Sequence, residues 1–180
     1  MTWRRLLSEL MATRAGAFGL IAVTLLLIVA IFAPLVASHD PNAIAPVNRL
    51  QGPSVAHFFG TDQLGRDLYS RVVYGARISI YVGVLSTLLG TALGAFAGLL
   101  SGFFGGRVDQ LIQRLADVMF TIPPLVLAMA IVTMLGPSLL NVIIAIAIPR
   151  LPNTNRVIRS AVLSARESLY VEASRALGCS

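Results

Sequence analysis

The stretch ISIYVGVLSTLLGTALGAFAGLL, residues 78–100, runs for 23 residues without a charged side chain. That length is enough for an α-helix to cross the hydrocarbon core of a bilayer. Gly90, Gly94, Gly98 and Gly102 recur every four residues and therefore share one face of the predicted helix. Glycine is unfavourable inside a helix, so a face made of it indicates close contact with a neighbouring helix. That neighbour belongs either to this chain or to a second subunit, and the sequence favours neither.

The rest of the chain is similarly apolar. Of its 180 residues, 56% are hydrophobic and 12% are charged, with a mean hydropathy of +0.80, which indicates an integral membrane protein. All 14 basic residues are arginine. A phosphate-binding Walker A loop needs lysine, so ATP hydrolysis of that kind would belong to a partner. The arginines flank apolar runs, and the net charge of +6 therefore favours membrane topology over nucleic-acid binding.

A first apolar run, residues 16–37, follows a basic start that contains Arg4, Arg5 and Arg14. The run exceeds the usual core of a signal peptide, so we expect a retained membrane span. The basic start predicts a cytoplasmic N-terminus. Residues 38–77 then form an outer loop that contains His39 and His57. Two isolated histidines 18 positions apart predict no metal site, and we expect both to be solvated.

Residues 118–148 carry no charge, and Gly136-Pro137-Ser138 divides them into a hairpin. The predicted third span is 118–135, with Pro123 and Pro124 near its start. The fourth has a ten-residue apolar stretch, 139–148, and must continue through residues 149–155 to cross a bilayer. Polar and helix-breaking residues at that depth are candidates for pore lining or kinking, although Arg150 suits an interfacial role equally well. These candidates are Asn141, Pro149, Arg150, Pro152 and Asn153.

Four spans with a cytoplasmic N-terminus place ten of the 14 arginines inside and four in the outer loop, in agreement with the positive-inside rule. The expected fold is thus an all-α membrane protein with four transmembrane helices. Asp109 and Asp117, in the predicted cytoplasmic segment 101–117, are eight residues apart among arginines. We expect them to be solvated on a membrane-surface helix, and the sequence offers no catalytic residues.

Residues 59–79 read F-G-T-D-x-x-G-R-D-x-x-S-R-x-x-x-G-x-R-x-S. Thr61 and Asp62 are candidate helix N-caps, and Asp67 and Arg71 are spaced for an i, i+4 pair. The same string resembles the segment before the second span of C-type permeases from dipeptide, oligopeptide and nickel importers. A second string, G-x-F-G-G-x-x-D-x-x-I-x-R-x-x-D from Gly102, resembles the same family.

Residues 150–180 are basic and amphipathic, which by pattern alone also fits a helix lying on lipid. The segment Tyr170–Gly178 resembles the first half of the EAA loop of these permeases, with Ser174 at the third position of the motif. In that family the loop forms a short cytoplasmic helix that docks on the ATPase subunit. The resemblance therefore implies ATPase coupling by Tyr170, Glu172, Ala173, Ser174 and Gly178. Small residues permit close packing, and glycine can end the helix.

The resemblance implies the N-terminal part of a type-1 ABC-importer permease, with four helices and the start of the coupling helix. Residues 1–77 would hold the tail, first span and outer loop, and 78–180 the permease domain. The expected protein lies in the inner membrane, is no enzyme and carries no cofactor. Its expected partners are a second permease subunit, two ATP-binding subunits that use the ATP, an extracytoplasmic solute-binding protein and membrane lipid, without nucleic acid.

Dipeptides or oligopeptides are the expected cargo, with nickel as the runner-up. The family continues with two further spans, so we expect the chain to be truncated at its C-terminus. The alternative of another class is a membrane anchor or scaffold that does not transport, whose basic terminal helix binds anionic lipid.

Overall fold

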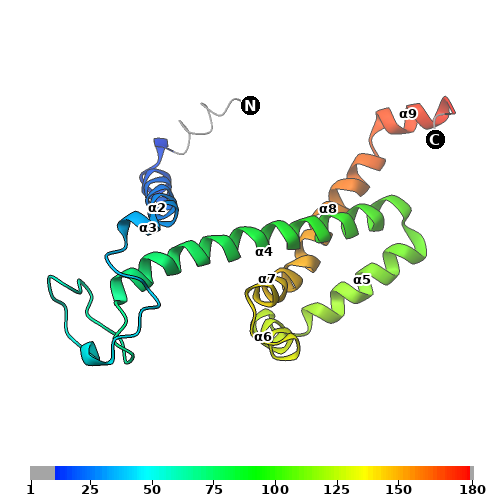
Figure 1. Cartoon of the computed structure of the whole chain (residues 1–180). Helices are drawn as coiled ribbons and strands as arrows, with labels where there is room; N and C mark the ends of the chain where they lie inside the picture. Colours follow the sequence, from blue (N-terminus) through cyan, green and yellow to red (C-terminus); the bar gives the residue numbers. More distant parts are fainter. Residues whose placement is uncertain (1–10, 179–180) are drawn as a thin grey trace. The chain divides into compact units, whose positions relative to one another are not determined.

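The regular structure of the protein is helical. The computed structural model describes residues 11–178, except for the side chains at positions 170, 172, 174 and 175. Over that range there are no strands, and an isolated antiparallel β-bridge joins Thr61 to Asp67. The α-helices are α2 (Arg14–Ile31), α3 (Ala33–Val36), α4 (Leu68–Phe104), α5 (Gly106–Phe120), α6 (Pro124–Leu135), α7 (Leu139–Ala147), α8 (Leu151–Arg166) and α9 (Leu169–Ala176) (Figure 1). Two 3-10 helices, η1 (Pro46–Asn48) and η2 (Ile148–Arg150), complete the set. The predicted all-α architecture is confirmed.

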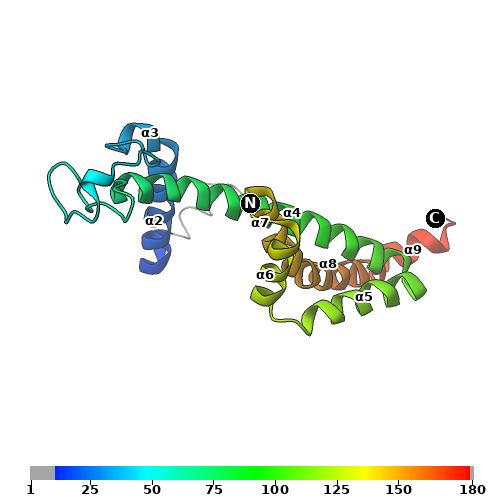
Figure 2. The ribbon, with the colours of Figure 1, turned by 60° about the horizontal axis from the view of Figure 1, so that its bottom comes forward.

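The chain forms two compact units, Met1–Tyr81 and Val82–Ser180. The first contains α2, α3, the loop with η1 and the start of α4. The second contains the rest of α4 and every later helix. In the second unit α5 packs against α8, and α6 packs against α7 (Figure 2). This unit holds the predicted pore candidates and the backbone of the predicted coupling helix.

Two of the described helices, α2 and α4, are long and apolar enough to cross a membrane. A third span results if α5 and α6 are taken as one broken span, so the expected count of four is not confirmed. The predicted span 118–135 is not one continuous helix, because Val118 lies within α5 and the path bends by 94° before α6. Pro123 and Pro124 explain the break, since proline lacks a backbone N–H and keeps the preceding residue out of the helical region.

The chain beyond the hairpin is helical from Leu139 to Arg166 in three pieces, α7, η2 and α8. Gly136 takes a φ of +88°, and the hydroxyl of Ser138 caps α7 by accepting a hydrogen bond from the backbone N–H of Asn141. Pro149 lies within η2, where its missing N–H accounts for the local change from α to 3-10 geometry. The helical path therefore extends past the apolar stretch 139–148, as expected from a stretch too short to cross a bilayer by itself.

Candidate functional site

The glycine edge of α4 faces later helices of the same chain. A Cβ atom placed on Gly90, Gly94, Gly98 or Gly102 would lie 2.6–2.8 Å from an atom of residue 147, 154, 155 or 162. Carbon atoms of real side chains do not approach that closely, so glycine is what allows α4 to lie so near α7 and α8. The sequence allowed either a helix of this chain or one of a second subunit as the neighbour, and the structure places this chain's own helices against the glycine edge.

One end of this packing carries a group of polar side chains, here called the polar cluster: Ser101, Asp109, Gln113, Asn155 and Arg159. Arg159 donates from Nε and from one terminal nitrogen to the two carboxylate oxygens of Asp109, each at 2.6 Å. The buried hydroxyl of Ser101 also donates to Asp109, and Gln113 donates to the Ser101 oxygen at 2.9 Å. The polar cluster therefore joins α4, α5 and α8.

Asp109 is not solvated, which corrects the prediction for that residue. Its side chain is 18% exposed and its carboxylate is fully engaged by Arg159 and Ser101. Asp117 is 63% exposed, as expected, although it also pairs with Arg156 at 2.5 Å. The two acids thus lie in different surroundings on one helix, because Asp109 faces α4 and α8 whereas Asp117 faces outward.

Two more arginines of α8 reach the preceding helices. The guanidinium of Arg156 lies 4.3 Å from the ring centre of Phe120 in α5. Arg166 donates to the carbonyl oxygens of Gly102 and Phe103, at 2.8 and 3.2 Å, at the C-terminal end of α4. A cation is favourable there, because the last carbonyls of a helix lack intrahelical partners and carry partial negative charge. Arg156, Arg159 and Arg166 therefore hold α8 against α4 and α5 along its length.

The predicted coupling segment follows directly. Glu167 and Ser168 separate α8 from α9, and α9 ends at Ala176. Gly178 takes a φ of +86°, a conformation that favours glycine after a helix. Ala173 is exposed, as are Leu169 and Leu177. The predicted coupling side chains of Tyr170, Glu172 and Ser174 lie outside the described residues.

Three of the five pore candidates line one cavity. Pro149, Arg150 and Asn153 border a space of about 520 Å³ together with α6 residues that include Pro124 and Leu125. Pro152 lies elsewhere, beside a mostly apolar cavity of about 230 Å³ between α4, α5 and α8. The candidates of the 149–153 stretch thus divide between two faces of the helical path.

Asn141 lies apart from both cavities. Its side-chain amide donates to the carbonyl oxygens of Leu135 and Gly136, at 2.8 and 2.9 Å. These oxygens belong to the C-terminal end of α6, where intrahelical donors are absent. The contacts show Asn141 fastening the α6–α7 hairpin.

In residues 38–67, called the outer loop after its predicted side of the membrane, the motif that begins at Phe59 builds a tight backbone structure. Gly60 and Gly65 take φ values of +76° and +75°. A Cβ on Gly60 would overlap the carbonyl oxygen of Gln51, and one on Gly65 would overlap that of Ala45. Both positions therefore require glycine for conformation and for space.

Asp62 organises the same turn and does not cap a helix, so that prediction is wrong. Its carboxylate accepts hydrogen bonds from the backbone of Leu64 and Arg66 and from the side chains of Arg66 and Arg71. Partial burial raises the pKa of Asp62, but these hydrogen bonds and the charge of Arg66 outweigh it and hold the pKa well below its usual range. Arg71 therefore pairs with Asp62, where an i, i+4 pair with Asp67 was expected.

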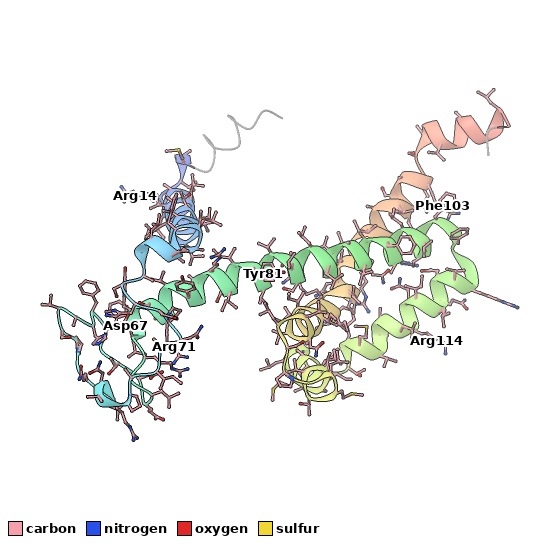
Figure 3. All side chains as sticks on the ribbon, viewed as in Figure 1. Arg14, Asp67, Arg71, Tyr81, Phe103 and Arg114 are labelled. Carbon is pink, nitrogen blue, oxygen red and sulfur yellow. The ribbon has the colours of Figure 1, made fainter. Side chains whose placement is uncertain are left out.

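Asp67 is the residue that caps α4. Its side chain is 1% exposed, and one oxygen accepts from the backbone N–H of Ser70 at 2.8 Å. The other oxygen lies 2.9 Å from Nδ1 of His57. Burial raises the pKa of Asp67, but hydrogen bonds from Ser70 and His57 have the larger effect and hold the pKa below its ordinary value. Figure 3 labels Asp67 and Arg71 at the start of α4, among the side chains of the outer loop.

The two histidines are brought together, which corrects the prediction that they are isolated; His39 is exposed as expected, whereas His57 is not. The ring centres of His39 and His57 are 4.8 Å apart, and the side chain of His57 is only 12% exposed. No sequence pattern indicates this contact, since the 17 residues between the histidines fold back against the turns at Gly60 and Gly65, whose geometry depends on glycine.

The polar cluster was also missed, although the sequence carried a signal for it. Asp109 precedes Asp117 in α5, and Arg156 precedes Arg159 in α8. The observed pairs are Asp109 with Arg159 and Asp117 with Arg156, the order expected when two helices run antiparallel. No comparable spacing marks the other members of the polar cluster, Ser101, Gln113 and Asn155. They are recognised as members only by their place in the folded structure.

Comparison with known proteins gives two family matches. Residues 90–180 match the family described as binding-protein-dependent transport system inner membrane component. Residues 1–53 match the N-terminal TM domain of oligopeptide transport permease C.

Individual relatives match nearly the whole chain. A dipeptide transport system permease protein of Alkalihalophilus pseudofirmus is 44% identical over 176 residues, covering 98% of this chain and 58% of the relative. A probable D,D-dipeptide transport system permease protein of Escherichia coli is 44% identical over 160 residues, covering 89% and 54%. A glutathione transport system permease protein of Shigella sonnei is 42% identical over 179 residues, covering 99% and 58%. The chain thus spans 58% or less of the length of these relatives.

Proposed function

The chain belongs to the family of binding-protein-dependent transport system inner membrane components, and we propose that it acts as the permease subunit of an ATP-driven importer of dipeptides or oligopeptides. The observation that carries this proposal is the 44% identity to a dipeptide permease along 98% of the chain. The names of the other relatives mention D,D-dipeptides and glutathione, which are also peptides. Neither nickel as cargo nor a scaffold role has support in these names.

The proposed complex contains a second permease subunit, two ATP-binding subunits that hydrolyse the ATP, and an extracytoplasmic solute-binding protein. The proposed orientation has the N-terminus and α9 in the cytoplasm, in agreement with the arginine distribution. In this arrangement α9 meets the ATPase, through Tyr170, Glu172, Ala173, Ser174 and Gly178. The chain itself supplies no chemistry and needs no cofactor, because its role is mechanical.

The described contacts support a path for such a mechanical role. Movement of α9 passes to α8, which precedes it in the chain and is separated from it by two residues. Three arginines tie α8 to α4 and α5, and the glycine edge of α4 keeps the helix backbones in direct contact. Such a packed group moves as one body, so a shift of α9 would change the cavity beside Pro149, Arg150 and Asn153. Alternation between an inward-open and an outward-open state then needs only a difference in ATPase affinity for the two states.

Replacing Glu172 with arginine in the complete importer tests the docking assignment. We expect the Glu172→Arg permease to insert into the membrane normally but to lose co-purification of the ATP-binding subunit. The matched control is Glu167→Arg, the same charge change at the end of α8, which should retain the ATPase. If Glu172→Arg retains the ATPase as well, α9 is not the docking helix.

Cargo is tested separately by uptake. Cells that depend on this importer should accumulate labelled dipeptide, and excess unlabelled dipeptide should compete with it. Peptide uptake that is independent of the permease would contradict the cargo assignment without affecting the docking result.

A further inference from the structure

The pair of histidines in the outer loop has a geometry that the transport role does not use. His39, His57 and Asp67 each offer a donor atom, and these atoms all lie within 4.8 Å of one another. His39 is exposed, whereas His57 and Asp67 are largely or fully buried. They come from three separate parts of the first unit: the segment after α3, the loop and the residue that caps α4.

Hydrogen bonds fix which ring nitrogen of His57 is protonated. The Asp67 carboxylate can only accept, so the Nδ1 atom of His57, 2.9 Å away, donates to it. In the neutral imidazole the Nε2 atom then carries a free lone pair. A carboxylate that holds a histidine in this way is the usual support behind a metal-binding imidazole, because it sets the tautomer and the ring orientation.

His39 is prepared in the same manner through Ser38. The Ser38 hydroxyl donates, at 3.5 Å, to Oδ2 of Asp67, the same oxygen that accepts from the backbone N–H of Ser70, and His39 Nδ1 lies 3.1 Å from the Ser38 oxygen. With the hydroxyl hydrogen directed to Asp67, Ser38 accepts from Nδ1 of His39, which leaves Nε2 of His39 unprotonated. The backbone N–H of His39 donates to the side-chain hydroxyl of Ser70 at 3.0 Å, which fixes the position of this segment on α4.

A purely structural role explains only half of this arrangement. Asp67 caps α4 and needs a partner for its second oxygen, which His57 supplies. Nothing in that role requires a second imidazole beside His57. His39 also borders a cavity of about 510 Å³, lined in addition by Asp40, Asn42 and Tyr74, which leaves room for water molecules as further ligands.

We propose that His39 and His57 bind one borderline divalent transition cation through their Nε2 atoms, with Asp67 as the residue that orients His57 and water completing the coordination. Imidazole nitrogen suits zinc, copper and nickel ions, and Zn²⁺ is the probe we would use. Zinc–nitrogen bonds of about 2.1 Å place two ligands of one ion at most about 4.2 Å apart. Binding is therefore confined to positions of the exposed His39 ring that bring its Nε2 atom within about 4.2 Å of the Nε2 atom of His57.

The experiment titrates the full-length purified chain with Zn²⁺ against a chromophoric chelator, using an affinity tag that contains no histidine. The chain has only two histidines and one cysteine, Cys179, so three single substitutions are enough to remove each of its histidine and cysteine metal ligands in turn. We expect one site, with affinity lowered at least tenfold in His39→Gln and in His57→Gln. Cys179→Ser is the matched control and should bind zinc with unchanged affinity. Asp67→Asn should weaken binding by roughly 10- to 100-fold, as measured for similar orienting residues.

His39→Gln is the decisive variant, because it leaves the bond between His57 and Asp67 intact. Unchanged zinc affinity in His39→Gln would overturn the proposal, as would binding that disappears in Cys179→Ser. Cu²⁺ bound to the native chain should show nitrogen hyperfine splitting from two imidazoles in its electron paramagnetic resonance spectrum, and from one in His39→Gln. A spectrum without imidazole nitrogen would also overturn it.

Discussion

Arg159 and Asp109 are 50 residues apart in the sequence and form a two-point hydrogen-bonded ion pair, with both N–O distances at 2.6 Å. The pair is partly buried, with 33% and 18% of the two side chains exposed. Two parallel hydrogen bonds fix the angle between the guanidinium and the carboxylate as well as their distance. This pair therefore sets how α8 lies on α5.

Replacing Arg159 with alanine should destabilise the protein by about 2 kcal/mol, because a mostly buried carboxylate loses its charged partner. Thermal unfolding in detergent measures this as a fall in melting temperature. The matched control is Arg156→Ala, which breaks the exposed pair with Asp117 and should cost no more than about 1 kcal/mol. Equal effects of the two substitutions would show that burial of Asp109 does not matter for stability.

The glycine edge gives a second prediction. Gly98→Ala should be destabilising by about 1–3 kcal/mol, because the added methyl group meets the carbonyl of Asn155 at 2.6 Å and forces the helices apart. Gly83 lies in the same helix with no atom within 4 Å of an added Cβ. Gly83→Ala should therefore stabilise the protein by up to about 1 kcal/mol, the ordinary gain for alanine in a helix. Unfolding curves for the two variants should shift in opposite directions, and a shared direction would contradict the packing of α4.

The apolar runs and the glycine spacing predicted much of the fold, because both depend on the sequence of one helix at a time. The prediction of an Asp67–Arg71 pair was wrong because it depended on where the helix begins. An i, i+4 pair exists only where both residues lie inside a helix, and α4 begins at Leu68. Asp67 instead turns toward the N–H of Ser70, and Arg71 reaches Asp62 in the preceding turn. Contacts between segments that are far apart, such as that of His39 with His57, leave no periodic trace in the sequence.

Asp62 gives the outer loop a predicted dependence on acid. Its pKa in the folded protein is below the unfolded value of about 3.9, so its stabilising effect is complete above that value. The effect is lost as the pH falls through the folded pKa. Hydrogen exchange in residues 38–67, corrected for the intrinsic exchange rate, should therefore be constant from pH 8 to pH 5 and rise below about pH 4.

Asp62→Asn provides the control for this prediction. The amide cannot keep the charged hydrogen bonds to Arg66 and Arg71, so the variant should exchange faster at pH 7. It should also lose most of the dependence on acid. If exchange in the native loop already rises above pH 5, a group other than Asp62 controls its stability.

Arg166 joins the end of α8 to the end of α4, immediately before the segment proposed to meet the ATPase. Arg166→Gln should weaken this junction, because a neutral amide makes a poorer partner for the terminal carbonyls of a helix. In the reconstituted importer we expect the ATP-binding subunits to co-purify normally. Stimulation of ATP hydrolysis by cargo and binding protein should fall several-fold, since movement of α9 no longer passes fully to α4.

The control is Arg114→Gln, an exposed arginine of α5 for which no hydrogen bond or ion pair is found among the described residues (Figure 3). Loss of co-purification in Arg166→Gln would instead place this residue in the docking surface, and full stimulation would exclude the α8–α4 junction from the path of coupling.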